Sequence, residues 1–412
     1  MKAEILSIGS EFTSGQNLDT NCQWLSLRLA EIGIPVGWHT TVADDLDDNV
    51  AAFQIACQRA QLVIATGGLG PTQDDLTREV LAQVGGVELV FHEPSFTRIR
   101  AMFEKRKRAM PERNRVQAYF PAGAEPIANA HGTAPGIWMR VGSSIVVAMP
   151  GVPSEMCAMF EAEVKPRLLN LGLGGGVHVQ RKLNTFGLGE SHLEEKLLDL
   201  TRRGHVPEVG ITASDATISL RIFARAADFE QAQAQIAPVE ATIRERLGNF
   251  VYGVDHEELH DAVLALLAAK QQSLATAESV TAGLVANRLA TVPGASNWLR
   301  GGIIAYTNEM KTALLGVPKN LIDQHGAVSP QVAEAMALGA RECFGSDLAV
   351  STTGYAGPTA GPHQPVGLVY VGLAWSGGVA SWTFNWFGTR AEIQSRTAKM
   401  ALNRVRLHLL ER

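Results

Sequence analysis

The sequence predicts an α/β protein made of three consecutive domains. Short apolar strands alternate with helical patterns over residues 1–170, which is typical of a parallel sheet covered by helices. A glycine-rich run at residues 171–177 follows and indicates a flexible boundary. A smaller α+β pattern occupies residues 178–253, and a second α/β pattern occupies residues 256–412. A chain of 412 residues is long enough for two or three such domains.

Composition and charge exclude several classes of protein. The chain is 46% hydrophobic and 19% charged, which is ordinary for packed globular domains. Its net charge of −5 provides no general basic surface, so we expect no direct binding of nucleic acid. No run of 18 apolar residues occurs and the first residues lead into a strand, so we expect neither membrane insertion nor export. The cysteines are widely spaced and form no CxxC pair, as in reduced cytoplasmic proteins: Cys22, Cys57, Cys157 and Cys343.

The first domain contains a loop suited to binding phosphate. Strands are expected at residues 3–9 and 62–65, and helices at residues 19–32 and 46–60. Ligands of such sheets bind at the carboxyl ends of the strands. The loop after the second strand, residues 66–77, reads TGGLGPTQDDLT, and its exposed backbone N–H groups can cradle a phosphate. The residues that we expect to contribute are Gly67, Gly68, Gly70 and Thr72.

Two carboxylates, Asp74 and Asp75, follow these glycines and are expected to open a helix. They are either helix N-terminal acids favoured by the helix dipole or ligands of a divalent metal that bridges pyrophosphate oxygens. Later segments of the same domain supply further candidate substrate contacts at Asn114, Asn129 and Gly151.

The last domain contains a strand, a turn and a helix around Ser279. An apolar run at residues 273–277 meets Glu278 and Ser279, and a helical pattern opens at residues 281–283. This junction places the Ser279 hydroxyl at a helix N-terminus, where free N–H groups favour an oxyanion. A second strand at residues 302–306 leads into a helix that carries Lys311.

Serine and lysine together form a possible hydrolase site. A serine needs an adjacent base to become a nucleophile, and a lysine can be that base only if its pKa is lowered. The stretch therefore supplies a nucleophile in Ser279, a base in Lys311 and a neighbouring phenol in Tyr306. Spacing alone favours the commoner roles, an N-cap serine and a solvated helix lysine.

A second loop and an arginine complete this candidate site. Residues 352–358 follow an apolar strand, and their threonines and N–H groups can orient a phosphate or an amide. Arg390 either grips a phosphate or is a surface arginine. The lone histidines His325 and His363 lack metal-ligand spacing, so we assign them no catalytic role.

Ordered motifs run through this domain: AESVTAG from Ala277, VPGAS from Val292, GGIIAYTNEMK from Gly301, HGAVS from His325 and TGYAGP from Thr353. They resemble the C-terminal domain of the CinA family, the nicotinamide-mononucleotide deamidases. The resemblance implies an α/β amidase that needs no cofactor, with Ser279 as nucleophile and Lys311 as base. We expect Tyr306 and Thr353 to join the catalytic site. The expected substrate contacts are Glu278, Thr281, Gly283, Asn308, Gly354, Ala356, Gly357 and Arg390.

The motifs GGLGPTQDD and PGVPSEM resemble the molybdopterin-binding-like domain found at the N-terminus of CinA proteins. This resemblance implies a three-layer α/β fold and hydrolysis of ADP-ribose with a divalent metal (Mg, Mn or Co) held by Asp74, Asp75 and Glu11. Ser10 stands where the family has an aspartate, which leaves the affinity for metal open. The family also has a KH-like module at residues 178–253. The GLGG run at residues 172–175 does not lie between helices, so we expect a spacing or dimerisation role for this module.

Three residues depart from the family motifs in the last domain. Val280 replaces a cysteine, which matters little if the side chain only packs. Ala282 replaces a glycine, which is unfavourable if the backbone there needs a positive φ. Tyr355 replaces an isoleucine and is expected to narrow the pocket.

We therefore expect a cytoplasmic homodimer that deamidates nicotinamide mononucleotide and cleaves ADP-ribose. Two alternatives remain at this point. The N-terminal domain binds molybdopterin or a nucleotide without hydrolysis, or the whole chain is a non-enzymatic accessory factor in competence or the DNA-damage response.

Overall fold

The computed structural model describes residues 2–361 and 364–411, so His363 lies outside the described residues. The chain divides into two compact units. The first comprises Met1–Val179 with Ala224–Ala234, and the second comprises Gln180–Phe223 with Gln235–Arg412. Within the described residues, no helix is long and apolar enough to cross a membrane.

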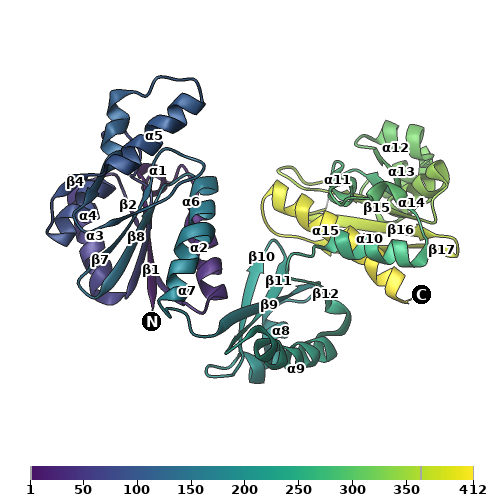
Figure 1. Cartoon of the computed structure of the whole chain (residues 1–412). Helices are drawn as coiled ribbons and strands as arrows, with labels where there is room; N and C mark the ends of the chain where they lie inside the picture. The colour runs from purple at the N-terminus through teal and green to yellow at the C-terminus, as the bar shows by residue number, and fades with distance from the viewer. Residues whose placement is uncertain (1, 362–363, 412) are drawn as a thin grey trace. The chain divides into compact units, whose positions relative to one another are not determined.

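The first unit is built on a six-stranded sheet in the order β2-β1-β3-β8-β7-β6 (Figure 1). Its strands are β1 (Ala3–Ile8), β2 (Val36–Val42), β3 (Leu62–Thr66), β6 (Glu125–Ile127), β7 (Gly136–Val141) and β8 (Ser144–Met149). The first four strands in the sheet order are parallel, and β7 and β6 are antiparallel additions at one edge. A separate two-stranded ribbon pairs β4 (Leu89–Phe91) with β5 (Tyr119–Pro121).

Helices cover both faces of this sheet and give the expected three layers. One apolar cluster joins the sheet to α2 and α6, and another joins its opposite face to α3 and α4. The helices are α1 (Ser10–Thr13), α2 (Thr20–Glu31), α3 (Leu46–Arg59), α4 (Thr77–Gly85), α5 (Glu93–Lys105), η1 (Glu112–Ala118), α6 (Pro153–Met159), η2 (Phe160–Val164) and α7 (Lys165–Asn170). The expectation that Asp74 and Asp75 open a helix is wrong, because α4 begins at Thr77.

The middle segment forms a four-stranded sheet in the order β10-β11-β9-β12. Its elements are β9 (Val177–Phe186), α8 (Glu190–Thr201), β10 (Glu208–Ser214), β11 (Thr217–Ala226), α9 (Phe229–Leu247), η3 (Gly248–Phe250) and β12 (Val251–Val254). This is the small α+β module expected from the sequence.

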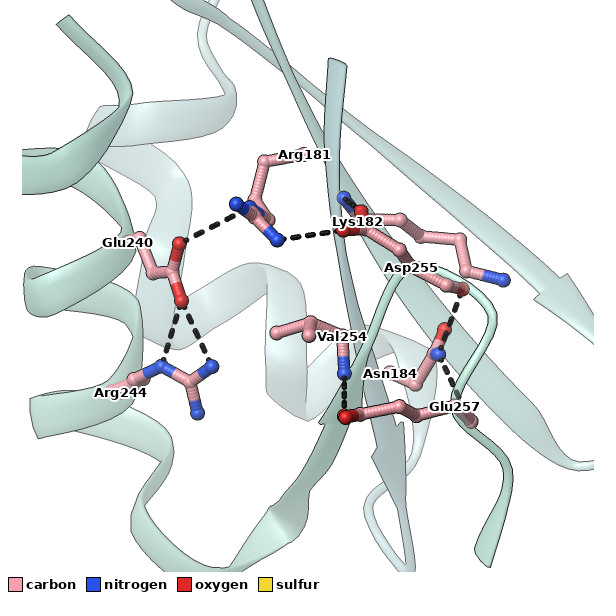
Figure 2. A network of polar contacts seen from close by, with 8 residues as sticks. All are labelled: Arg181, Lys182, Asn184, Glu240, Arg244, Val254, Asp255 and Glu257. Atoms are coloured by element: carbon pink, nitrogen blue, oxygen red, sulfur yellow. Dashed lines mark hydrogen bonds and ion pairs between the residues drawn. The ribbon is translucent and has the colours of Figure 1, made fainter. Parts of the chain in front are cut away.

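A polar network holds the connector after β12 (Figure 2). Arg181 of β9 lies 3.5 Å from Glu240 of α9 and 2.6 Å from Asp255 of the connector. The Lys182 N–H also donates to Asp255, and the Asn184 amide donates to the carbonyl oxygens of Asp255 and Glu257. The last domain therefore leaves the middle sheet through a segment that several hydrogen bonds fix.

The last domain has a five-stranded sheet in the order β14-β13-β15-β16-β17. Strands β14, β13 and β15 are parallel, and β16 and β17 are antiparallel. The strands are β13 (Leu274–Glu278), β14 (Leu299–Ile304), β15 (Leu348–Gly354), β16 (Leu368–Trp375) and β17 (Gly378–Asn385).

Helices again cover both faces of this sheet. One apolar cluster joins it to α10, α11 and α15, and a second joins it to α12, α13 and α14. The helices are α10 (Leu259–Lys270), α11 (Leu284–Ala290), η4 (Ala295–Asn297), α12 (Asn308–Leu315), α13 (Lys319–His325), α14 (Pro330–Phe344) and α15 (Arg390–Glu411). The α/β class and the three-part organisation predicted from the sequence are confirmed.

Candidate active site

Ser279 lies at the carboxyl end of the central strand β13, in the turn that leads to α11. Its N–H donates to the Thr352 carbonyl of the neighbouring strand β15. The turn closes when the Ala282 N–H donates to the Ser279 carbonyl, at 3.2 Å. The serine is therefore held from both sides at the sheet edge where α/β proteins bind their ligands.

Glu278 holds this turn through hydrogen bonds between its carboxylate and the residues that follow Ser279. Its side chain is 1% exposed and accepts from the Thr281 hydroxyl and from the N–H groups of Gly283, Val285 and Ala286. A carboxylate at this place satisfies the orphan donors of α11 and complements the helix dipole. Both carboxylate oxygens of Glu278 are therefore occupied by hydrogen bonds within the protein.

Lys311 lies on α12, the helix that follows β14, and its side chain extends to Ser279. Its Nζ lies 3.1 Å from the Ser279 Oγ and 3.4 Å from the Tyr306 carbonyl oxygen. Lys311 is 2% exposed and Ser279 is 8% exposed. In this geometry a neutral Lys311 can accept the proton of the serine hydroxyl directly.

The surroundings of Lys311 favour its neutral form. Burial lowers the pKa of Lys311 from its ordinary value of 10.5, and Glu309 opposes this shift. The carboxylate of Glu309 is exposed and is itself held by its own backbone and by Thr307. Water screens an exposed charge of this kind, so desolvation decides the direction of the shift.

Two N–H groups beside Ser279 are available for an oxyanion. Within the described residues, the N–H groups of Val280 and Thr281 have no hydrogen-bond partner, although both residues are buried. Buried N–H groups without a partner are rare and commonly mark a functional site. Gly283, which was expected among the substrate contacts, does not offer its N–H to a ligand, because that N–H donates to Glu278.

Tyr306 and Arg390 form the rim of the site. Arg390 donates to the Tyr306 hydroxyl at 2.5 Å and to the Gly357 carbonyl at 2.6 Å. Arg390 thus joins Tyr306, which follows β14, to Gly357 in the loop after β15, and the residue as a whole is exposed. Asn308 begins α12 and is also exposed, close in sequence to this rim.

Thr352 and Thr353 lie at the end of β15, which extends to Gly354, so the loop expected to start at residue 352 starts after the strand. The hydroxyls of these two threonines have different surroundings. The Thr352 hydroxyl lies 2.6 Å from the Thr281 hydroxyl and therefore belongs to the serine turn. The Thr353 hydroxyl donates to the Ala327 carbonyl and is committed to the loop before α14. The sequence named Thr353 as a catalytic residue and gave Thr352 only as one of the threonines that follow the strand. The contact of Thr352 with Thr281 depends on the pairing of β13 with β15, which the sequence alone does not show.

The departures from the family motifs have clear structural settings. Val280 is 4% exposed and packs against Val369 and Ile393, so this side chain only fills space. Ala356 lies in the same apolar cluster and does not face solvent. Gly354 is packed against Leu368 and Val369, so no side chain fits there. Ala282 has a φ of 51°, the left-handed conformation that favours glycine.

The glycine-rich loop of the first unit lies at the carboxyl end of β3. Gly67 has a φ of 113°, and a Cβ there would lie 2.2 Å from the Ile8 carbonyl oxygen. Only glycine fits this approach between β1 and the loop. Gly151 lies against Gly67 from the loop after β8, where its carbonyl accepts from the Asn21 amide.

A buried arginine supports this loop from beneath. Arg78 is 3% exposed and donates to the carbonyl oxygens of Leu69 and Gly70. Thr77 fixes the two preceding peptides, because its hydroxyl donates to the Gly67 carbonyl and its N–H donates to the Gly68 carbonyl. The Gly68 and Leu69 N–H groups of those peptides therefore point to the opposite side. In the described part of the chain, the N–H groups of Gly68 and Leu69 have no hydrogen-bond partner. The sequence analysis missed Arg78, and its only signal was a charged residue on an otherwise buried helix face.

The acidic residues of this region do not gather into one cluster. Asp75 accepts from the N–H groups of Gly70 and Thr72 and from the Thr72 hydroxyl, so it closes the loop on itself. The expectation that the Gly70 and Thr72 N–H groups are exposed is therefore wrong. It is also wrong for Gly67, whose N–H donates to the Met149 carbonyl of β8. The Asp74 carboxylate stays exposed, and the Thr72 hydroxyl lowers its pKa. Glu11 folds back onto its own turn at Gly9.

Asn114 and Asn129 are also committed to internal contacts. Asn114 is 5% exposed and donates to Gln117, which in turn reaches the Leu69 carbonyl behind the loop. Asn129 is 3% exposed and organises the 129–134 loop, and its amide also donates to Glu155. Asn129 also lines a cavity of about 220 Å³ beside α5.

The expected metal ligands do not fit a preformed site. Among residues 2–361 and 364–411, no three His, Cys, Asp or Glu side chains come together in an arrangement that could hold a metal. Ser10, at the position of the family aspartate, instead binds the Asp44 carboxylate through its N–H and hydroxyl. We therefore derive no reaction step through a metal in this domain.

Comparison with known proteins gives three family matches. The model described as "CinA C-terminal domain" matches residues 256–409, "Probable molybdopterin binding domain" matches residues 4–170, and "Damage-inducible protein CinA KH domain" matches residues 180–253.

Relatives match over the whole length of the chain. A CinA-like protein of Dictyoglomus thermophilum is 44% identical over 411 residues and is covered over 100% of both chains. A CinA-like protein of Kosmotoga olearia is 43% identical over 411 residues, covering 100% of this chain and 99% of the relative. A crystal structure of the protein CinA from Thermoplasma acidophilum has 35% identity and a TM-score of 0.38, covering 40% of this chain and 96% of that one.

Proposed function

The chain belongs to the CinA family, and we propose that its C-terminal domain hydrolyses the carboxamide of nicotinamide mononucleotide to a carboxylate, releasing ammonia. One observation carries the proposal: the buried Lys311 Nζ lies 3.1 Å from the Ser279 Oγ. The simpler roles of an N-cap serine and a solvated lysine do not account for this contact. Glu278 caps α11 in place of Ser279, and Lys311 is not solvated.

The chemistry follows from this contact. The Ser279 Oγ attacks the carboxamide carbon while the neutral Lys311 Nζ takes the hydroxyl proton. The carbonyl oxygen becomes an oxyanion, which the N–H groups of Val280 and Thr281 stabilise. Lys311 then gives the proton to the leaving nitrogen, the C–N bond breaks and ammonia departs, leaving an ester on Ser279.

Water completes the reaction by the same steps in reverse order. Lys311 takes a proton from a water molecule, whose oxygen attacks the ester carbon. Collapse of the second oxyanion breaks the bond to the Ser279 Oγ, which recovers its proton from Lys311. The product is nicotinate mononucleotide, and every proton passes through the Lys311 Nζ.

The choice of a nucleotide as substrate rests on the family and on the rim. Arg390 holds Tyr306 and the 352–358 loop together while it remains exposed, so it is placed to meet a phosphate at the mouth of the site. Nicotinamide and nicotinamide riboside present the same carboxamide without the phosphate. A phosphate-reading rim therefore predicts a higher kcat/KM for the mononucleotide than for either of them.

The test is to incubate the full-length chain with these three compounds and to measure ammonia, with and without a chelator. We expect ammonia to be released from the mononucleotide, and we expect the chelator not to abolish this release. The reason is that the proposed chemistry uses Ser279 and Lys311 and no metal. Absence of ammonia release from all three amides overturns the proposal. It favours the alternative of a non-enzymatic accessory protein.

For the N-terminal domain we propose binding of a phosphate-bearing nucleotide at the Gly67–Thr72 loop, with ADP-ribose as the compound implied by the family. The supporting observation is the pair of unpartnered N–H groups at Gly68 and Leu69, above a buried Arg78. Successive N–H groups of this kind bind anions. Asp74 is the carboxylate free to meet a divalent metal carried by the phosphates. Calorimetric titration with ADP-ribose, with and without Mg²⁺, tests binding, and release of AMP separates binding from hydrolysis.

A further inference from the structure

Helix α15 contributes a residue to the serine turn that the sequence motifs do not indicate. The side-chain amide of Gln394 donates from its Nε2 to the Val280 carbonyl oxygen at 2.9 Å, although the two residues are 114 positions apart. A carbonyl oxygen only accepts, so the amide nitrogen must be the atom that faces it. The contact is half-buried and lies on the carbonyl of the residue directly after the nucleophile.

That peptide is the one which carries a proposed oxyanion donor. The carbonyl of Val280 and the N–H of Thr281 belong to one planar trans unit, so they point to opposite sides. A hydrogen bond that fixes the carbonyl therefore also fixes the direction of the Thr281 N–H. The N–H itself has no partner within the described residues.

The rest of the turn is held by other groups, which leaves this peptide to Gln394. Glu278 holds the segment that follows, from the Thr281 hydroxyl to the Ala286 N–H. The bond from the Ala282 N–H to the Ser279 carbonyl closes the ends of the turn. The described residues provide no bond to the Val280–Thr281 peptide other than that from Gln394.

The position of Gln394 on its helix is well fixed. Its neighbour Ile393 is 1% exposed and packs in the apolar cluster that contains Val280. Its other neighbour, Ser395, accepts from Arg288 of α11 and donates to Asp215 of the middle module. One turn earlier, Arg390 reaches the rim of the site.

We propose that Gln394 is a positioning residue of the oxyanion hole, which holds the Val280–Thr281 peptide so that the Thr281 N–H faces the developing negative charge. This inference rests on the proposed amidase function. Gln394 does not touch the reacting atoms, and it acts through the peptide that it holds.

The main variant is Gln394→Met, which keeps the length and the helix propensity of the side chain but removes the donor. Loss of an oxyanion donor costs about 10²–10³ in kcat, so loosening one donor is expected to cost roughly tenfold. We expect this loss in kcat with little change in KM, because the charge develops only in the transition state. Gln394→Arg, which restores an N–H donor of similar reach, is expected to recover much of the loss. Gln331→Met, on an exposed site of α14, is the matched control with unchanged kinetics.

A second measurement does not depend on the amide substrate. A fluorophosphonate labels an activated serine and places its phosphoryl oxygen in the same hole, so its labelling rate reports the hole directly. We expect Ser279 to be labelled more slowly in Gln394→Met than in the Gln331→Met control, by the same factor as kcat falls.

The outcomes separate this inference from the proposed function. A wild-type protein that releases ammonia, with a Gln394→Met variant equal to it in kcat and in labelling rate, overturns the role of Gln394 alone. A change in KM with an unchanged kcat also overturns it. So does a folded Gln394→Arg variant that recovers no activity. If Ser279 of the wild type is labelled but no ammonia is released, the proposed amide substrate is rejected. The role of Gln394 is then decided by the comparison of labelling rates. A Ser279 that the fluorophosphonate does not label overturns both.

Discussion

The Lys311 Nζ and the Ser279 Oγ lie 3.1 Å apart, and the amine that makes this contact is almost completely removed from water. A buried lysine makes the folded state less favourable, because its charge is poorly solvated. The arrangement that suits the chemistry therefore lowers the stability of the domain, as is common at active sites.

The first prediction concerns this cost. Burial holds the pKa of Lys311 below its value in the unfolded chain, so the unfolded state binds more protons between the two pKa values. The free energy of unfolding of the wild type therefore rises with pH over that range, and the lysine's penalty is fully present below it. We expect Lys311→Met to be more stable than the wild type at neutral pH, with a difference that shrinks toward pH ~10.4. Urea unfolding across this pH range measures it, and a methionine variant that is less stable at every pH contradicts it.

The second prediction concerns Ala282, whose φ of 51° is unfavourable for a residue with a Cβ. The left-handed conformation costs roughly 1–2 kcal/mol for such a residue, and the greater freedom of glycine in the unfolded chain offsets part of the gain. We expect Ala282→Gly to raise the free energy of unfolding by about 0.5–1 kcal/mol. The control is Ala335→Gly inside α14, which is expected to lower it by about 1 kcal/mol. Two equal losses would show that the turn does not store this strain.

The third prediction concerns the cap made by Glu278. Glutamine in its place turns one acceptor into a donor that faces the N–H groups of α11, so at least one of them loses its partner. We expect Glu278→Gln to lower the free energy of unfolding by about 1–3 kcal/mol and to lower kcat, because the serine turn is built on this cap. The exposed Glu342→Gln of α14 serves as the control. A Glu278→Gln protein with wild-type stability would falsify the capping role.

The fourth prediction separates the two aspartates of the glycine-rich loop. Asp75→Asn disturbs the loop, because the carboxylate accepts from Gly70 and from Thr72. We expect it to cost about 1–3 kcal/mol of stability and to weaken ADP-ribose binding with or without Mg²⁺. Asp74→Asn is expected to leave stability unchanged and to weaken only the Mg²⁺-dependent part of binding. Thermal unfolding and calorimetric titration of both variants measure this, and the reverse pattern contradicts it.

The sequence predicted central strands, the layers and the order of the motifs, because apolar runs and turn residues are local signals. The bounds of α2 and α3 illustrate this, since Thr20–Glu31 and Leu46–Arg59 differ from the expected ranges by a residue at the ends. Local signals gave no expectation for β2, β6 or β7 of the first sheet. Local spacing supplied Ser279 and Lys311 as parts of a possible site, since each follows a neighbouring parallel strand, and the resemblance to the family assigned them the roles of nucleophile and base.

The details of the site depend on long-range contacts, which spacing does not encode. The sequence placed the start of α11 at residues 281–283, whereas it begins at Leu284 and is capped by a carboxylate that precedes it by six positions. It could not show that Asp75 turns back onto its own loop or that Arg78 lies beneath it. Gln394 lies 114 residues from the turn that it contacts, so only the packed fold brings the two together.

The most direct test of the central claim compares ammonia release by the wild type, Ser279→Ala and Lys311→Arg on nicotinamide mononucleotide, with substrate binding measured for each folded variant. The account predicts that Ser279→Ala binds the nucleotide but loses nearly all turnover, because the serine does chemistry. It predicts that Lys311→Arg fails as well, because arginine stays protonated. If Ser279 merely stabilised the turn, its loss would cost about 1 kcal/mol of stability and little activity. A Ser279→Ala protein that releases ammonia at a near wild-type rate contradicts the account.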